Sequence, residues 1–273
     1  MIRLIRVSVD ATEVRSGTGR KITEGLAERA LSRDTQGMCG RYTLTTPDLE
    51  ALARVVQAEI SPQLRAEYRP RYNIAPTQPT TIVCEEPDDG GTVRRLELAV
   101  WGLQFASGRP GAQINVRAET AATAPSSREV FARGRCGIVA DGFFEWSGPK
   151  EHRQPHWFHA PNGRLIVFAG LYKDVVEADS GEVRRHFAIL TTGANQVVAP
   201  HHDRMPAIVP RGQLGRWLAP LPRTASMAEK TAVAHLLGPA PDDMLVATPV
   251  STRVNSPRFD DPACLQADPT LLE

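Results

Sequence analysis

The feature that most constrains the fold is a series of short, strand-like apolar segments interrupted by turns. Residues rich in Pro, Gly and Asp separate the segments, and PDDGG (87–91) and PNG (161–163) are typical of hairpin turns. The expected strands are 41–46, 80–86, 94–103, 134–146, 156–160, 164–172 and 185–192. Many short strands with few helices between them predict an α+β fold. We expect a single domain, mainly an antiparallel, barrel-like β-sheet with peripheral helices.

Helical spacing of apolar residues is clearest in PDLEALARVVQA (47–58), with Thr46 or Asp48 as the candidate N-cap. The Pro- and Arg-rich stretch 61–78 that follows is expected to be a loop. Shorter helices are expected near 126–133, 195–199, 211–218 and 228–237.

The bulk composition is that of an ordinary soluble globular protein, since 41% of the 273 residues are hydrophobic and 23% are charged. No apolar run approaches the roughly 18 residues that a membrane span needs. Arg3, Arg6 and Asp10 interrupt the apolar residues that a secretory signal would require. We therefore expect a cytoplasmic, nucleoid-associated protein. Residues 1–37 are expected to be a disordered, mis-annotated or removable N-terminal extension, and 38–273 a catalytic domain.

The net charge and the spacing of cysteines and histidines argue against some binding partners but identify none. The formal net charge is +1, so a nucleic-acid-binding protein of this composition would need a local basic patch. The four cysteines form no CxxC pair and the seven histidines form no HExxH motif, so no metal site is expected. Cys84, Cys136 and Cys264 are expected to be small buried hydrophobic residues or surface thiols.

Cys39 differs from these three cysteines because it follows Met38, in the stretch GMCGRYTLTTP (37–47). If synthesis began at Met38 and that residue were removed, Cys39 would carry both a free α-amine and a thiol. No internal cysteine offers this pair of nucleophiles.

Two further segments place polar side chains where an ordinary β-core needs none. In INVRAETA (114–121), strand alternation would put Asn115, Arg117 and Glu119 on one side, where an arginine fork and an amide could hold a phosphate. An exposed polar face with an ordinary ion pair is the alternative. In DGFFEW (141–146), Glu145 lies among aromatic residues, and apolar surroundings raise a carboxyl pKa toward acid–base use. The alternative is a carboxylate that faces water.

The segment HHDRMPAIV (201–209) brings two histidines to a turn before an apolar strand. One of them could move protons near neutral pH, although a loop histidine is commonly structural or solvated. Arg204 could bind a second phosphate or pair with Asp203. Elsewhere in the chain, two tryptophans, Trp101 and Trp146, could belong to the core or could stack on an unpaired base.

Taken together, these motifs closely resemble those of the SRAP family (SOS-response-associated peptidases, also called abasic-site processing proteins). The resemblance rests on MCGRY, YNIAPTQ, WGL, INVRAETA, DGFFEW and HDRMP in this order, and on the C-terminal segment PVSTRVNSPRFDDPACL (249–265). It covers 38–273 and leaves out 1–37.

The resemblance implies a sensor of abasic sites in single-stranded DNA that crosslinks to them through a thiazolidine on Cys39 and shields them. The implied catalytic residues are Cys39, Glu145, which orients the Cys39 amine, His202, a general acid–base at the sugar, and Asn115. The implied DNA contacts are Arg41, Asn73, Trp101, Asn115, Arg117, Trp146, Thr191 and Arg204. His201 is taken as structural. No metal or organic cofactor is implied, the protein is expected to be a monomer, and self-cleavage ahead of Cys39 is an associated activity.

Two other functions stay open on the sequence alone. One is a cysteine-type peptidase or amidase that acts on external substrates, with Cys39 as nucleophile and His202 as base. The other is a single-stranded DNA-binding module that forms no covalent bond and in which Cys39 is structural.

Overall fold

The computed structural model describes residues 40–105, 112–222 and 224–267. Residues 1–37, with the predicted N-terminal extension, and Cys39 lie outside the described residues. Within them no helix is long and apolar enough to cross a membrane.

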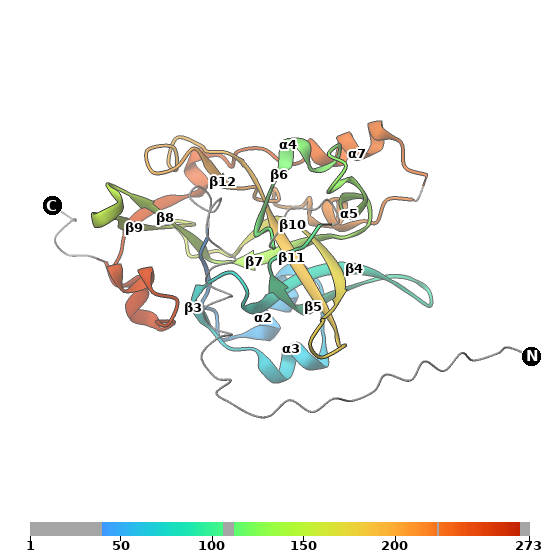
Figure 1. Cartoon of the computed structure of the whole chain (residues 1–273), viewed down its shortest axis with the longest axis horizontal. Coiled ribbons are helices and arrows are strands. Elements are labelled where there is room, and N and C mark those ends of the chain that lie inside the picture. The colour runs from blue at the N-terminus through green and yellow to red at the C-terminus, as the bar shows by residue number, and fades with distance from the viewer. Residues whose placement is uncertain (1–39, 106–111, 223, 268–273) are drawn as a thin grey trace, which may run out of the picture.

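Five long strands close into a barrel (Figure 1). They are β4 (Pro79–Asp88), β5 (Gly91–Trp101), β7 (Arg135–Ala140), β10 (Ile166–Val176) and β11 (Val183–Gly193). Neighbours pair antiparallel in the order β11-β10-β7-β4-β5, and a parallel β11–β5 pairing closes the ring. Three short strands add to it, namely β2 (Glu59–Ile60) beside β5, and β6 (Asn115–Arg117) and β12 (Arg204–Pro206) beside β11. The prediction of a mainly antiparallel, barrel-like fold is confirmed.

A second, antiparallel sheet has the order β13-β9-β8-β1-β3. Its strands are β1 (Tyr42–Leu44), β3 (Arg71–Ile74), β8 (Gly142–Ser147), β9 (Gln154–His159) and β13 (Val246–Pro249). The first and last parts of the described chain therefore meet in this sheet, as the blue and red segments of Figure 1 show.

Helices lie around the outside of the two sheets, as expected (Figure 1). They are α2 (Leu49–Val56), α3 (Pro62–Glu67), α4 (Ala118–Ala121), α5 (Arg128–Arg133), α6 (Leu214–Leu218) and α7 (Met227–Ala234). Short 3₁₀ turns are η1 (Lys150–His152), η2 (Asp242–Met244), η3 (Thr252–Asn255) and η4 (Pro262–Leu265). Helix α2 begins at the predicted cap, where the Asp48 side chain accepts from the Ala51 amide.

The core of the molecule is aromatic and spans both sheets. Tyr42 of β1 packs edge-on against Trp101 of β5, with ring centroids 5.2 Å apart, and against Phe168 of β10 at 6.0 Å. Phe143 of β8 contacts the same Phe168 at 5.9 Å. These edge-to-face contacts hold the second sheet against the barrel.

The structure corrects three of the predicted elements. Residues 134–146 form two strands in different sheets, because the chain turns at Asp141, whose carboxylate accepts from the Thr43 hydroxyl and from the Thr45 amide (2.6 Å). The expected loop 61–78 contains α3 and β3, and Ser61 caps α3 by accepting from the Leu64 amide. The expected helix 195–199 is a hydrogen-bonded turn.

Candidate active site

The strand that leads to Cys39 lies beside the strand that carries Glu145. Tyr42 of β1 is paired with Phe143 of β8, and one residue further the Phe144 amide donates to the Arg41 carbonyl (3.0 Å). Gly40 is the first described residue. The covalent chain ties Cys39 to Gly40 by one peptide link of about 3.8 Å between Cα atoms.

Glu145 is a buried acid. Its side chain is 4% exposed, and among the described residues its Oε1 has no hydrogen-bond partner. Burial raises the pKa of this carboxyl to about 8, with a further rise from the charge of Asp203 and an opposing effect from Arg153. The raised pKa that the aromatic neighbours of Glu145 predict is confirmed. The carboxyl group is therefore mostly protonated at neutral pH.

His202 lies in the turn before β12, and its ring orientation is fixed by the backbone. Its Nδ1 accepts from the Arg204 amide at 2.9 Å, so in the neutral ring the proton resides on Nε2. The effect of Asp203 on Glu145 indicates that this turn faces β8. One group able to move protons thus lies on β8 of the second sheet and another in the turn before β12 of the barrel.

His201 belongs to a packed cluster instead. Its ring lies 4.2 Å from that of His156 and 5.3 Å from that of Phe158. Burial lowers the pKa of His201, and the neighbouring His156 lowers it further. This packing favours the structural role expected for His201.

The INVRAETA segment divides between a strand and a helix. Asn115 and Arg117 lie in β6, whose parallel pairing aligns Arg117 with Thr191 of β11. Asn115 is 8% exposed, whereas Arg117 is exposed. Strand alternation ends at Arg117, so Glu119 lies in α4 and not on the same strand face, which corrects the expectation.

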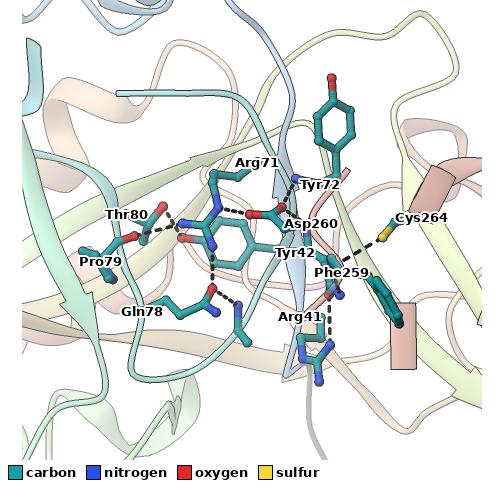
Figure 2. Close-up of polar contacts among 12 residues, drawn as sticks. Arg41, Tyr42, Arg71, Tyr72, Gln78, Pro79, Thr80, Phe259, Asp260 and Cys264 are labelled. Carbon is teal, nitrogen blue, oxygen red and sulfur yellow. Dashed lines mark hydrogen bonds and ion pairs between the residues drawn. The ribbon is translucent and has the colours of Figure 1, made fainter. Parts of the chain in front are cut away.

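The C-terminal segment holds β1 and β3 through a polar network that sequence reasoning missed (Figure 2). Figure 2 shows the Asp260 carboxylate between Arg71 and the backbone of Tyr72, where it accepts from Arg71 Nε and from the Tyr72 amide (2.6 Å). It also accepts from the Asn73 amide at 2.9 Å. The family resemblance included residues 249–265, but the sequence could not show that this segment contacts β3, which lies far away in the chain.

Two residues predicted to contact DNA, Arg41 and Asn73, belong to the same polar network. The Asn73 side chain is fully buried, donating to the carbonyls of Val254 (3.1 Å) and Phe259 (2.8 Å) and accepting from Arg41 Nη1 (2.9 Å). Arg41 also donates to the Val254 carbonyl at 2.8 Å. Asn73 is therefore a structural residue, which corrects its assignment as a DNA contact.

The chain is similar in sequence to proteins of one known family. The family model described as SOS response associated peptidase (SRAP) matches residues 38–257. The chain belongs to the SRAP family. Abasic site processing protein YoqW of Bacillus subtilis is 31% identical over 236 residues, which cover 84% of this chain and 100% of the relative. Abasic site processing protein YedK of Escherichia coli is 27% identical over 183 residues, covering 66% of this chain and 79% of the relative.

A solved structure shares the fold seen here. The crystal structure of a protein from Bacteroides thetaiotaomicron superposes with a TM-score of 0.68 at 23% identity, covering 84% of this chain and all of the other. At that identity the likeness concerns the fold alone.

Full burial argues against two further DNA contacts that the SRAP resemblance implied. Trp101 is fully buried, and its Nε1 donates to the Ile114 carbonyl at 2.9 Å, so the ring has no free face for a base. Thr191 is also fully buried. The DNA contact of Arg204 stays a prediction: its side chain is 13% exposed and forms a bidentate ion pair with Glu119, with both N–O distances at 2.8 Å.

Of the remaining candidates, Trp146 follows Glu145 on β8 and packs against Phe144, with ring centroids 6.3 Å apart. Its Nε1 donates to Asn255 Oδ1 at 2.7 Å, and the side chain is half-buried. Cys84, Cys136 and Cys264 are all buried, as expected. The described residues contain no cluster of three or more side chains that could hold a metal.

Proposed function

We propose that this SRAP protein processes abasic sites in single-stranded DNA by forming a covalent thiazolidine crosslink through Cys39. The observation that carries the proposal is the buried Glu145, whose pKa is raised, on the strand beside β1, and Cys39 stands three residues before the first residue of β1. The names of the curated relatives support the substrate, because both are abasic site processing proteins.

The chemistry uses the two nucleophiles of one residue. The open-chain sugar of an abasic site presents an aldehyde at C1′. The α-amine of Cys39 adds to this carbon, and loss of water gives a Schiff base. The Cys39 thiol then gives up its proton and its sulfur adds to the carbon of the protonated imine, which closes a five-membered ring whose nitrogen keeps its hydrogen. Because the second addition is intramolecular, its effective concentration is high.

Glu145 supplies the proton that loss of water requires. Its carboxyl, with a pKa of about 8, is protonated at neutral pH and can donate to the departing hydroxyl. The resulting carboxylate can then accept the thiol proton as the ring closes. Within the described part of the chain Glu145 forms no ion pair, so neither protonation state of this buried acid is locked, which suits the exchange.

His202 acts on the sugar. With Nδ1 engaged by the Arg204 amide, the Nε2 proton is available to the ring oxygen of the closed sugar, and its donation favours ring opening to the aldehyde. The same nitrogen can take a proton back in later steps.

Asn115, Arg117 and Trp146 hold the DNA in this scheme. The exposed Arg117 binds a phosphate through its planar fork, and Asn115 orients the backbone next to the lesion. The half-buried Trp146 offers a ring on which a neighbouring base can stack.

The α-amine must first be released, since an amide nitrogen cannot form a Schiff base. One route is translation from Met38 followed by removal of that methionine. A second is self-cleavage of the Met38–Cys39 bond by the same Glu145 and His202, a peptidase activity that the family description suggests. The mass of the protein from its native host distinguishes the released form from the 273-residue chain.

The test incubates a single-stranded oligonucleotide that carries one abasic site with protein beginning at Cys39, and resolves the products on a denaturing gel. We expect a heat- and detergent-stable adduct from this form and none from the chain that begins at residue 1, unless it cleaves itself. Cys39→Ser keeps the amine and should give an imine that only borohydride traps. Cys264→Ala, which removes a buried thiol elsewhere, is the matched control.

Two outcomes would favour the other functions. If Cys39→Ala leaves all DNA association unchanged and no adduct forms, the protein is a DNA-binding module that forms no covalent bond. Labelling of Cys39 by a peptide-like acylating probe without DNA, together with no adduct, would indicate a cysteine peptidase that acts on external substrates.

A further inference from the structure

Glu119 of α4 and Arg204 of β12 form an ion pair, in which Arg204 stands two residues after His202 in the sequence. The proposed mechanism gives this ion pair no role. Glu119 Oε1 and Oε2 each accept from Arg204 at 2.8 Å, one from Nη1 and the other from Nη2. This fork-on-fork geometry is more directional than a single contact. The bond to Arg204 holds the pKa of Glu119 below its usual range, so the carboxylate stays charged.

Arg204 connects this ion pair to the ring of His202. Its guanidinium also donates to the Thr191 carbonyl (2.5 Å), and its backbone pairs with Gly193 of β11. The backbone amide of the same residue donates to His202 Nδ1 at 2.9 Å. Contacts with α4 and β11 thus fix Arg204 of β12. The backbone N–H of Arg204 in turn decides which nitrogen of the His202 ring carries the proton.

The other possible hydrogen-bond partners of His202 Nδ1 show why the position of Arg204 matters for the tautomer. The Arg204 carbonyl and the Asp203 carboxylate both lie 3.2 Å from Nδ1, and either would accept from a protonated Nδ1. The Arg204 amide, in contrast, can only donate. Holding Arg204 in place therefore favours the tautomer with the proton on Nε2, the nitrogen that the proposed mechanism uses.

We propose that Glu119 is a positioning residue for His202 and acts through Arg204. The inference rests on the proposed function only for its kinetic consequence, because the tautomer of His202 can be measured without DNA. Glu119 itself contacts neither nucleophile nor sugar in this account.

The first measurement is the ¹⁵N spectrum of the histidine rings in the full chain, with His202 assigned by comparison with His202→Gln. In wild type, the neutral form of the His202 ring should carry its proton on Nε2. Glu119→Gln keeps the shape of the side chain but loses its charge, and should shift His202 toward a mixture of tautomers while leaving the other histidines unchanged. Glu182→Gln is the control, because Glu182 pairs with Arg184 in an exposed ion pair of similar length (2.9 Å).

The second measurement is a double-mutant comparison of crosslinking rates with protein beginning at Cys39. We expect Glu119→Gln to slow the reaction about tenfold, a part of the 10²–10⁴-fold that a general acid–base residue contributes. In the His202→Gln background the same substitution should have almost no further effect.

The outcomes separate the two proposals. An unchanged His202 spectrum in Glu119→Gln, or an equal slowing in both backgrounds, would overturn the positioning role. Absence of any crosslink by the wild-type protein would instead contradict the proposed function, while a shifted His202 tautomer would still support the link through Arg204.

Discussion

Replacing Glu145 with glutamine should change how the stability of the protein depends on pH. The folded state holds this carboxyl at a pKa of about 8, against a value of 4.5 for the group outside the fold. Between these two values the folded state binds more protons than the unfolded state, so the free energy of unfolding falls as the pH rises. Below pH 4.5 both states are protonated and the group contributes no pH dependence.

The magnitude follows from the size of the shift. A difference of about 3.5 units between the two pKa values corresponds to about 5 kcal/mol once the pH exceeds the higher one, and to about 3 kcal/mol at pH 7. Since the side chain is only 4% exposed, solvent screens little of this effect. Glu145→Gln removes the titration, so the variant should lose less stability than wild type between pH 5 and 8.

Urea unfolding of both proteins at a series of pH values measures the effect. The informative quantity is how the difference in unfolding free energy between the two proteins changes with pH. A constant difference is not informative, because the glutamine amide needs hydrogen-bond partners of its own. Glu182→Gln, at an exposed site, should run parallel to wild type. If the Glu145→Gln curve also runs parallel, the carboxyl is not protonated at neutral pH and its role as proton donor fails.

Three further substitutions test the structure. Arg135→Ala should cost about 3–5 kcal/mol in urea unfolding, because this residue is 3% exposed and its guanidinium donates to the carbonyls of Trp217 (2.7 Å) and Phe131 (2.6 Å). A loss below about 1 kcal/mol would contradict this. Asn73→Ala should speed amide hydrogen exchange within 252–265, measured by mass spectrometry, whereas unchanged exchange would show that Asn73 does not hold this segment. His201→Phe should lessen the loss of stability below pH 6.5, because a ring with a lowered pKa destabilises the fold as it charges; identical acid unfolding curves would refute it.

Local sequence signals predict the barrel strands and the cap of α2 well. Alternating apolar residues identify the barrel strands, and the PDDGG turn joins β4 to β5 as a hairpin, with Asp88 opposite Gly91. These features depend on neighbours in the chain. The turn at Asp141 could not be predicted in the same way, because its carboxylate is held by Thr43 and Thr45, almost a hundred residues earlier.

The candidate site shows the same division. The aromatic neighbours of Glu145 predict its buried acid, since they adjoin it in sequence. Trp101 and Asn73 were misassigned because a motif does not reveal whether a side chain points into the core or outward. Asp260 was missed because its partners, such as Tyr72, lie 188 residues away. Long-range contacts of this kind require the tertiary structure.

One carboxylate sets the register on which the proposed chemistry depends. Asp141 binds Thr43 and Thr45 of the N-terminal strand and stands four residues before Glu145, while Cys39 stands four residues before Thr43. Because side chains alternate along a strand, a slip of one residue between β1 and β8 would turn each side chain to the opposite face relative to its partner. Phe143, two residues before Glu145, stacks on Phe158 with centroids 5.1 Å apart, and both rings are fully buried. The acid and the residue next to the nucleophile therefore take their positions from a shared anchor, whereas His202 takes its position from the barrel.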